Sequence, residues 1–381
     1  MTDGVALAHD YATQRGGAER VALVMADAFP GSPMYTTLYD PDGTFPEFSH
    51  VPLRVSPLNR VPALRHDHRL ALPFLAPAVS FQRVVDADVL LASSSGWAHG
   101  YRGARRTVVY CYIPARWLYQ RDRYLGGQDA GGGLGTRLRS VAASSGLTVL
   151  TPALKRWDAR AAHRADTYLV CSTVAQRAVR EVYGFDAEVL APPPAMMPGG
   201  PSRPTDGVAP GFFLCVARLL PYKNVDVVID AAQRLGKRDL VIVGDGPERA
   251  RLEALAARSS DVRVHVLGRV DDDELRWLYG NAEALVAASY EDFGLSPLEA
   301  GAFGRPSVAL RAGGFLDSVR EGETGVFFDE LDAGLLADAL GAALEHPWDE
   351  QVQRDHAASF GTERFVRRLR DVVGAGSVTG R

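Results

Sequence analysis

Two glutamates, Glu291 and Glu299, lie in the stretch SYEDFGLSPLEAGAFGRPSV (289–308) and could hold the hydroxyl groups of a ligand. A capping box explains Glu299 without a ligand, because Ser296 is a good helix N-cap, Pro297 suits the first helical position and Glu299 falls at N3. No comparable local role explains Glu291, which precedes that cap in a loop. Glu291 is therefore the stronger candidate for a ligand-binding carboxylate.

The same loop leads into a helix, and a helix start attracts anions. Gly294 lets the backbone turn just before the predicted helix. The free N–H groups of residues 294–298 would then point at whatever lies in front of it. The helix dipole and these N–H groups together favour a phosphate.

Two cations follow an apolar strand-like run in VARLLPYKN (216–224). Arg218 offers a planar fork and Lys223 a compact charge, so the pair could clamp a diphosphate. The alternative is ordinary solvated surface charge. Lys223 is one of only three lysines in the chain, which slightly favours the clamp.

Two further glycine-bearing turns follow predicted strands. In QRGGAER (14–20), Gly16 and Gly17 would let a ligand approach the backbone, although a plain tight turn is the alternative. The spacing is not GxGxxG, so a dinucleotide fingerprint is not supported. The second turn, VGDGPE (243–248), is better explained as a structural strand-to-helix turn, with Pro247 at the first helical position.

Together, these features describe one kind of ligand. Cations and a helix start suit phosphates, whereas loop carboxylates suit hydroxyls. A ligand that carries both is a nucleotide sugar or a sugar phosphate.

These residues need elements that bring them to one edge of a sheet. Apolar strand-like runs alternate with helical segments on both sides of a Pro- and Gly-rich stretch at 192–210, which predicts two domains with parallel sheets. The strand-like runs are 4–10, 84–95, 107–113, 212–217, 240–244, 262–268 and 283–288. Two Rossmann-like β/α/β domains that face a central cleft are the expected α/β fold, with ligands at the carboxyl ends of the strands. The glycine-rich piece at 124–135 is a candidate mobile loop.

Composition excludes several classes of function. The chain has 381 residues, 46% of them hydrophobic, and a net charge of −4, so no nucleic-acid partner is expected. Its three cysteines are scattered, which indicates reduced, buried thiols. The N-terminus carries no signal peptide, and the longest near-apolar run, 70–81, is too short to span a bilayer, so a cytoplasmic location is expected. DDD (271–273) is interpreted as helix-capping charge, and no metal motif or cofactor is predicted.

The combined motifs resemble glycosyltransferase family four, the retaining GT-B enzymes, over nearly the whole chain. The C-terminal half carries Arg218 with Lys223, GDGP, LGRVDDDEL, Glu291-x7-Glu299 with FG inside, AGG, and EGETGVFF (321–328). The N-terminal half is similar to a bacterial polysaccharide subgroup that includes mannosyltransferases. It carries HDY, RGGAER, SSSGWAHG (93–100) and CYIPARWLYQ (111–120).

The resemblance implies a GT-B fold and a division of labour between its domains. Residues 1–195 would form the acceptor-binding domain and 205–351 the donor-binding domain, with a helix at about 352–372 packing back on the first. The implied reaction transfers a hexose, with mannose from GDP-mannose as the best candidate, to a hydroxyl of a saccharide, lipid-linked or small-molecule acceptor. The alternatives are a GT-B sugar-nucleotide epimerase or phosphorylase, and a non-catalytic nucleotide-binding module.

The resemblance also implies roles for single residues. Arg218 and Lys223 would grip the donor diphosphate, and Glu291 would bind the 3- and 4-hydroxyls of the donor sugar. Glu299 would bind the ribose hydroxyls, with the capping box as its rival. The remaining donor contacts would be the backbone of Phe293, Gly294 and Leu295, the Gly16–Gly17 turn, and Arg269 and Val270 beside the base.

The sequence departs from the family pattern on the acceptor side. Related sequences usually have a histidine where this chain has Tyr112, in Cys111-Tyr112-Ile113-Pro114, which weakens the case for a side-chain base there. The candidate acceptor contacts are His99, Tyr112, Arg116, Trp117 and Tyr119. Residues 60–83 mix Arg and His with Leu, Phe and Val, which suggests a surface for a membrane or a lipid-linked acceptor. The alternative is a packed helix with a basic outer face.

The implied chemistry needs no protein nucleophile. The leaving phosphate oxygen can accept the proton of the acceptor hydroxyl on the same face, which keeps the anomeric configuration. The enzyme then orients the substrates and stabilises the departing diphosphate, and we expect activity without a metal.

Overall fold

The structure is a computed structural model that describes residues 4–66, 68–120, 150–258 and 262–375. The chain divides into two compact units. The N-terminal unit comprises Met1–Pro192 with Thr362–Arg381, and the C-terminal unit comprises Pro193–Gly361. The glycine-rich piece at 124–135 lies outside the described residues.

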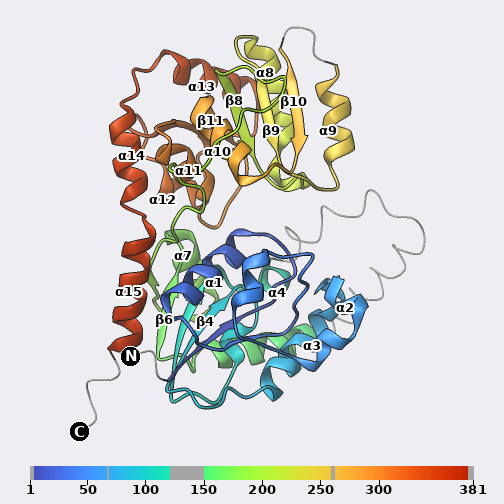
Figure 1. The fold of residues 1–381 in the computed structure, drawn as a ribbon, viewed down its shortest axis with the longest axis vertical. Coiled ribbons are helices and arrows are strands. Elements are labelled where there is room, and N and C mark those ends of the chain that lie inside the picture. The colour runs from blue at the N-terminus through green and yellow to red at the C-terminus, as the bar shows by residue number, and fades with distance from the viewer. Residues whose placement is uncertain (1–3, 67, 121–149, 259–261, 376–381) are drawn as a thin grey trace. The chain divides into compact units, whose positions relative to one another are not determined.

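The described part of the N-terminal unit contains a seven-stranded parallel sheet with the order β3-β2-β1-β4-β5-β6-β7 (Figure 1). Its strands are β1 Val5–His9, β2 Met34–Thr36, β3 Leu53–Val55, β4 Val89–Ser94, β5 Arg106–Cys111, β6 Thr167–Val170 and β7 Glu188–Val189. The apolar residues of β1, β4 and β5 are almost all buried, as expected of central strands covered on both faces.

Helices connect these strands, as parallel neighbours require. They are α1 Gly17–Ala28, α2 Pro62–His66, α3 His68–Phe81, α4 Arg116–Tyr119 and α7 Thr173–Tyr183, with a further helix over residues 150–162. Short 3₁₀ turns are η1 Pro46–His50, η2 Pro57–Arg60 and η3 Ala98–Gly100.

The C-terminal helix α15 Thr362–Gly374 completes the N-terminal unit. The Arg370 guanidinium donates to the carbonyl of Ala28 at the end of α1. Phe365 packs edge-to-face on Tyr110 of β5, with ring centroids 5.4 Å apart. These contacts fix α15 on the sheet and its covering helices although the C-terminal unit intervenes in the sequence.

The expected single helix at about 352–372 is two helices. The first, α14 Glu350–Ala358, packs on α11 Leu295–Ala302 in the C-terminal unit, and α15 belongs to the other unit. The break contains Gly361, a residue with low helix propensity. The division between the units falls after Pro192, at the start of the Pro- and Gly-rich stretch.

The C-terminal unit contains, in its described residues, a six-stranded parallel sheet with the order β10-β9-β8-β11-β12-β13 (Figure 1). Its strands are β8 Phe212–Val216, β9 Leu240–Val243, β10 Val264–Gly268, β11 Ala282–Ala287, β12 Ser307–Leu310 and β13 Gly325–Phe328. Besides α11 and α14, its helical elements are η4 Pro221–Lys223, α8 Val225–Leu235, α9 Arg249–Ala256, α10 Asp272–Asn281, α12 Phe315–Ser318 and α13 Ala333–Glu345.

Alternate residues of these strands fill two separate cores. On β8, Phe213 and Cys215 pack towards α8 and α13, whereas Phe212 and Leu214 pack towards α10. This period-two alternation with apolar residues on both faces is typical of a sheet covered by helices on both sides. Within the described ranges, no helix is both long enough and apolar enough to cross a bilayer.

Candidate active site

The loop that carries Glu291 connects β11 to α11, and Gly294 is the N-cap of that helix. Gly294 has φ of 91°, and a Cβ there would overlap the ring of Phe315. The helix therefore begins at Leu295, and Ser296 is its second residue. The capping-box interpretation of Glu299 is wrong, because the helix starts earlier and its N-cap makes no side-chain hydrogen bond.

The AGG turn at 312–314 holds the backbone of this loop. The N–H of Gly314 donates to the carbonyl of Glu291 at 2.8 Å. A Cβ at Gly313 would lie 2.5 Å from that carbonyl oxygen, and one at Gly314 would overlap the Cα of Phe293. Only glycines allow the two loops to pack this closely.

The Lys223 ammonium forms an ion pair with Oε1 of Glu291. The Ser289 hydroxyl donates to the same oxygen at 2.5 Å. Both charged side chains are largely shielded, with exposed fractions of 13% for Lys223 and 23% for Glu291. Two residues that the sequence suggested for different parts of a ligand thus lie in direct contact.

A left-handed residue places Lys223 beside Glu291. Asn224 has φ of 52°, and its side-chain amide donates to the carbonyl of Ala288 at 2.8 Å, just after β11. Asparagine tolerates this conformation better than most residues. The turn after β8 is thereby tied to the end of the neighbouring strand.

Arg218 lies on the same turn and is exposed. Its guanidinium donates to the hydroxyl of Tyr222 at 3.4 Å, and the ring of Tyr222 lies 5.2 Å from Nζ of Lys223. Tyr222 therefore contacts both members of the predicted cation pair. Sequence reasoning missed it, although its position next to Lys223 was a usable signal.

The GDG turn at 244–246 packs against the backbone of the turn that carries Arg218. Leu219 N–H donates to the carbonyl of Asp245 at 3.0 Å, and side chains at Gly244 or Gly246 would overlap the 217–219 backbone. The structural interpretation of this turn is confirmed. Its expected helix start is wrong, because α9 begins at Arg249 after an N-cap at Glu248 rather than at Pro247.

Arg269 and Val270 follow the carboxyl end of β10. Arg269 is exposed, whereas Val270 is partly buried against the core on the α10 side of the sheet. Phe293 is buried, and its ring lies 6.0 Å from that of Phe360. The predicted base and backbone contacts thus lie on loops that follow β10 and β11, and their roles stay predictions.

Glu299 anchors the first residues of the C-terminal unit. Its Oε2 accepts from the Tyr279 hydroxyl at 2.7 Å, and its Oε1 accepts from the N–H groups of Ala195 and Met196, both at 3.3 Å. Burial, followed by the charge of Glu299, raises the pKa of Tyr279. The alternative to a ribose-binding role for Glu299 is therefore this structural role, in which it holds the first residues of the C-terminal unit.

In the N-terminal unit, Gly16 is the N-cap of α1 and Gly17 is its first residue. The Tyr112 hydroxyl donates to the carbonyl of Ala18 at 3.0 Å and lies 3.0 Å from the hydroxyl of Ser93. Tyr112, which replaces the usual histidine, thus fixes the first turn of α1 from the end of β5.

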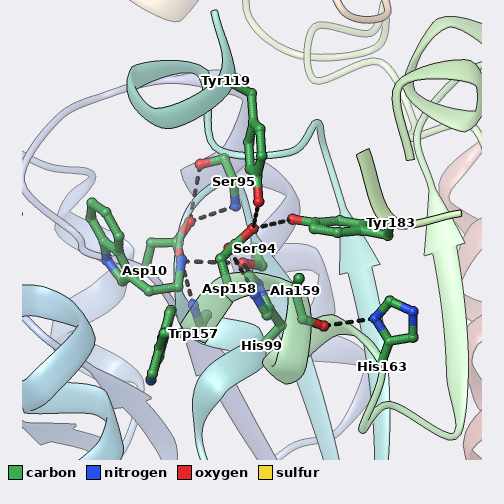
Figure 2. A network of polar contacts seen from close by, with 12 residues as sticks. Asp10, Ser94, Ser95, His99, Tyr119, Trp157, Asp158, Ala159, His163 and Tyr183 are labelled. Carbon is green, nitrogen blue, oxygen red and sulfur yellow. Dashed lines mark hydrogen bonds and ion pairs between the residues drawn. The ribbon is translucent and has the colours of Figure 1, made fainter. Parts of the chain in front are cut away.

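A buried polar network joins the carboxyl ends of β1 and β4 to the helix at 150–162 (Figure 2). Nδ1 of His99 lies 3.0 Å from the Ser94 hydroxyl, and Nε2 lies 3.1 Å from Oδ1 of Asp158. Oδ2 of Asp158 accepts from the hydroxyls of Tyr119 and Tyr183, both at 2.8 Å. Burial, followed by the Asp158 charge, raises the pKa of Tyr119.

Asp10 belongs to the same network (Figure 2), and the sequence analysis did not identify it. Its carboxylate accepts from the N–H groups of Ser95, Trp97 and Ala98, at 2.5, 3.0 and 2.7 Å. Asp158 was also missed, because nothing local marks a helical aspartate as the partner of a distant histidine.

The candidate acceptor contacts are mostly internal. His99, Tyr112 and Trp117 are buried, and the Trp117 ring packs on Trp97 with centroids 5.1 Å apart. Arg116 and Tyr119 are partly exposed. Acceptor contact by any of the five stays a prediction.

The acidic run at 271–273 opens α10, as expected. Asp271 is the N-cap, and its carboxylate accepts from the N–H of Glu274 at 2.9 Å. In the part of the chain that the structure describes, no three His, Cys, Asp or Glu residues gather in a way that could hold a metal. All three cysteines are buried, and burial raises the pKa of Cys215 to about 12.

The match to a family model lies in the C-terminal unit. Residues 207–360 match the family model described as glycosyl transferases group 1. A D-rhamnosyltransferase, WbpZ of Pseudomonas aeruginosa, is 34% identical over 158 residues, which cover 40% of this chain and 41% of the relative. A D-inositol 3-phosphate glycosyltransferase of Salinispora tropica is 35% identical over 178 residues, 42% of this chain and 37% of the relative. The chain thus spans less than half the length of these relatives.

Solved structures match over almost the whole chain. Anabaena Alr3699/HepE, crystallised with UDP, has a TM-score of 0.68 at 17% identity, over 98% of this chain and 100% of that chain. Sucrose-phosphate synthase from Thermosynechococcus elongatus has a TM-score of 0.70 at 18% identity, over 99% of this chain and 100% of that chain. Residues 207–360 are thus similar to the glycosyl transferases group 1 family, in a chain with the two-sheet GT-B fold.

Proposed function

We propose that the protein is a retaining glycosyltransferase that transfers a hexose from a nucleotide-diphosphate sugar to an acceptor hydroxyl. The observation that carries the proposal is the contact between Lys223 and Glu291, with Arg218 on the same turn. In a nucleotide sugar, the phosphate and the sugar ring are joined at the anomeric carbon. A site for that junction needs a cation and a carboxylate side by side, which is what these loops provide.

The proposed reaction uses these groups as follows. The bond between the anomeric carbon and the phosphate oxygen breaks while the acceptor oxygen bonds to the same carbon. The leaving phosphate oxygen takes the acceptor proton on the same face, so the configuration is kept and no protein nucleophile is required. Arg218 and Lys223 stabilise the charge that develops on the diphosphate, and Glu291 orients the sugar through its hydroxyls.

The donor is proposed to be GDP-mannose. The support is the resemblance of the HDY, RGGAER and SSSGWAHG motifs to bacterial mannosyltransferases. UDP is the nucleotide recorded for the Anabaena structure and is the first rival.

The proposal also covers where the acceptor binds and whether the reaction needs a metal. The N-terminal unit is proposed to bind the acceptor, with the Gly16–Gly17 turn facing the donor diphosphate. Arg218 and Lys223 supply the positive charge that a divalent cation supplies elsewhere, so activity is expected to persist in a chelator.

Product analysis tests the proposal. The protein is incubated with GDP-mannose, UDP-glucose, dTDP-glucose or ADP-glucose, with and without a panel of glycoside acceptors. The expected result is a nucleoside diphosphate and a glycoside of unchanged anomeric configuration, formed only with acceptor. A new sugar nucleotide formed without acceptor identifies an epimerase, a sugar phosphate formed with inorganic phosphate identifies a phosphorylase, and binding without turnover identifies a non-catalytic module.

A further inference from the structure

The outer face of α3 is apolar, although an exposed helix face is usually polar. Leu70, Phe74, Pro77 and Phe81 are all exposed, at the i, i+4, i+7 and i+11 positions that form one stripe of a helix. The exposed fractions are 52% for Phe74 and 86% for Phe81. The sequence left two alternatives for residues 60–83, a surface for a membrane or lipid-linked acceptor and a packed helix with a basic outer face, and this apolar outer face favours the first.

The inner face of the same helix is fully occupied. Leu75 and Val79 are buried, and the Ser80 hydroxyl accepts from the indole N–H of Trp157 at 2.9 Å. The exposed stripe is therefore not the core side of a loosely docked helix. It is a second apolar face, which the described residues of its unit leave exposed.

Further exposed apolar side chains flank the stripe. Val61 is 46% exposed and Val85 is 61% exposed. Among the described residues, the only large aromatic side chains with this degree of exposure are Phe74 and Phe81. Contiguous exposed apolar surface of this kind marks an interaction site more often than chance exposure does.

Arginines gather around the C-terminal end of the stripe. The Gln82 amide donates to the carbonyl of Arg54 at 2.8 Å, and Val84 N–H donates to the carbonyl of Arg102 at 2.8 Å. These bonds bring the backbones of Arg54 and Arg102 beside Arg83, next to Phe81. The three arginine side chains are exposed, and none forms an ion pair with a carboxylate among the described residues.

The cluster has one more basic member and little acidic compensation. The charge of Arg102 helps, after burial, to lower the pKa of Arg164. Residues 54–83 contain five arginines and a single acidic residue, in a chain whose net charge is −4. Such a local excess of positive charge favours an anionic partner.

We propose that this surface, defined by Leu70, Phe74, Phe81, Arg54, Arg83 and Arg102, docks on the headgroup region of an anionic lipid bilayer. Apolar rings on one helix face would enter the acyl boundary while the neighbouring arginines contact lipid phosphates. A protein partner would need a matching apolar groove, whereas a bilayer accepts an irregular stripe with a basic edge. The proposal does not depend on the identity of the donor.

Vesicle flotation tests the proposal with the full chain. The vesicles are phosphatidylcholine alone, or phosphatidylcholine and phosphatidylglycerol in equal parts. The wild-type protein is expected to float with the anionic vesicles and to be released by high salt. Phe74→Ser/Phe81→Ser is expected to weaken this binding about a hundredfold, about tenfold for each ring.

Matched variants separate the proposal from general effects. Leu331→Ser/Leu335→Ser removes two comparably exposed apolar side chains from the C-terminal unit and is expected to bind like wild type. Arg54→Glu/Arg83→Glu is expected to abolish binding to anionic vesicles. Its control, Arg177→Glu/Arg367→Glu, changes two other exposed arginines of the N-terminal unit and is expected to keep most of the binding. Thermal unfolding checks that each variant is folded. We expect every variant to fold, because all the substituted side chains are exposed.

Three results would overturn the proposal. The first is wild-type protein that ignores both kinds of vesicle. The second is Phe74→Ser/Phe81→Ser that floats as well as wild type. The third is a wild-type dimer that the same double variant converts to a monomer in sedimentation, because the surface would then serve a second copy of the chain.

Discussion

The ammonium of Lys223 and the carboxylate of Glu291 neutralise each other across two loops that are 68 residues apart in the sequence. One loop follows β8 and the other follows β11, which are neighbours in the sheet. The proposed donor would exchange this ion pair for phosphate on one side and sugar hydroxyls on the other.

Glu291→Gln should separate nucleotide binding from turnover. Losing the carboxylate frees Lys223, so we expect a nucleoside diphosphate alone to bind as well as before, or a few-fold more tightly. Turnover of the sugar nucleotide should fall at least about a hundredfold, because the sugar loses its orienting contact. Calorimetric titration with the nucleoside diphosphate and steady-state kinetics measure the two effects, and an equal loss of both would contradict the division of roles.

Lys223→Ala and Arg218→Ala should each reduce kcat at least about a hundredfold, since one preorganised donor to a departing oxyanion is worth roughly 3–4 kcal/mol. Lys237→Ala is the matched control, because that exposed lysine makes only a 3.8 Å ion pair with Glu345. Initial rates at saturating donor give the comparison. If Lys223→Ala keeps turnover near that of Lys237→Ala, the diphosphate clamp is wrongly assigned.

Tyr222 is expected to act as a positioning residue for both cations. Tyr222→Phe removes the hydroxyl that accepts from Arg218 and keeps the ring near Lys223, so it should raise KM for the donor a few-fold with little change in kcat. Tyr222→Ala removes both contacts and should lower kcat as well. A purely structural role predicts instead that both variants lose thermal stability while the kinetics of the folded fraction stay unchanged.

The elements were more predictable than the contacts between them. Strand-like runs placed β8 and β11 correctly, because buried parallel strands are continuous apolar segments, and α8 has the expected limits at 225–235. The ion pair of Lys223 with Glu291 could not be predicted, since it depends on which strands are neighbours in the sheet.

One wrong prediction and one open alternative have the same physical origin. A capping box at Ser296 and Glu299 is locally sound, yet Gly294 starts the helix earlier because it fits against Phe315, a contact that no local pattern encodes. At 60–83 the sequence left a membrane-facing surface and a packed helix with a basic outer face both open, because the exposed face of a helix depends on which face the core selects.

Gly314→Ala should damage the site without touching a ligand-binding side chain. A Cβ at Gly314 would overlap the backbone at Phe293, so the Glu291 loop has to shift. We expect a lower melting temperature and a loss of turnover of about tenfold or more, since small displacements of orienting groups are costly. Gly341→Ala is the control, because its Cβ would meet only Leu235 at 3.6 Å and alanine favours the helix α13.

A crystal structure of the protein soaked with an unhydrolysable sugar nucleotide tests the central claim most directly. The account predicts the diphosphate within hydrogen-bonding distance of Arg218 and Lys223, the sugar hydroxyls on the Glu291 carboxylate, and the Lys223–Glu291 contact lengthened or broken. A ligand bound elsewhere, or a diphosphate on these loops with Lys223 and Glu291 still paired to each other alone, would contradict it.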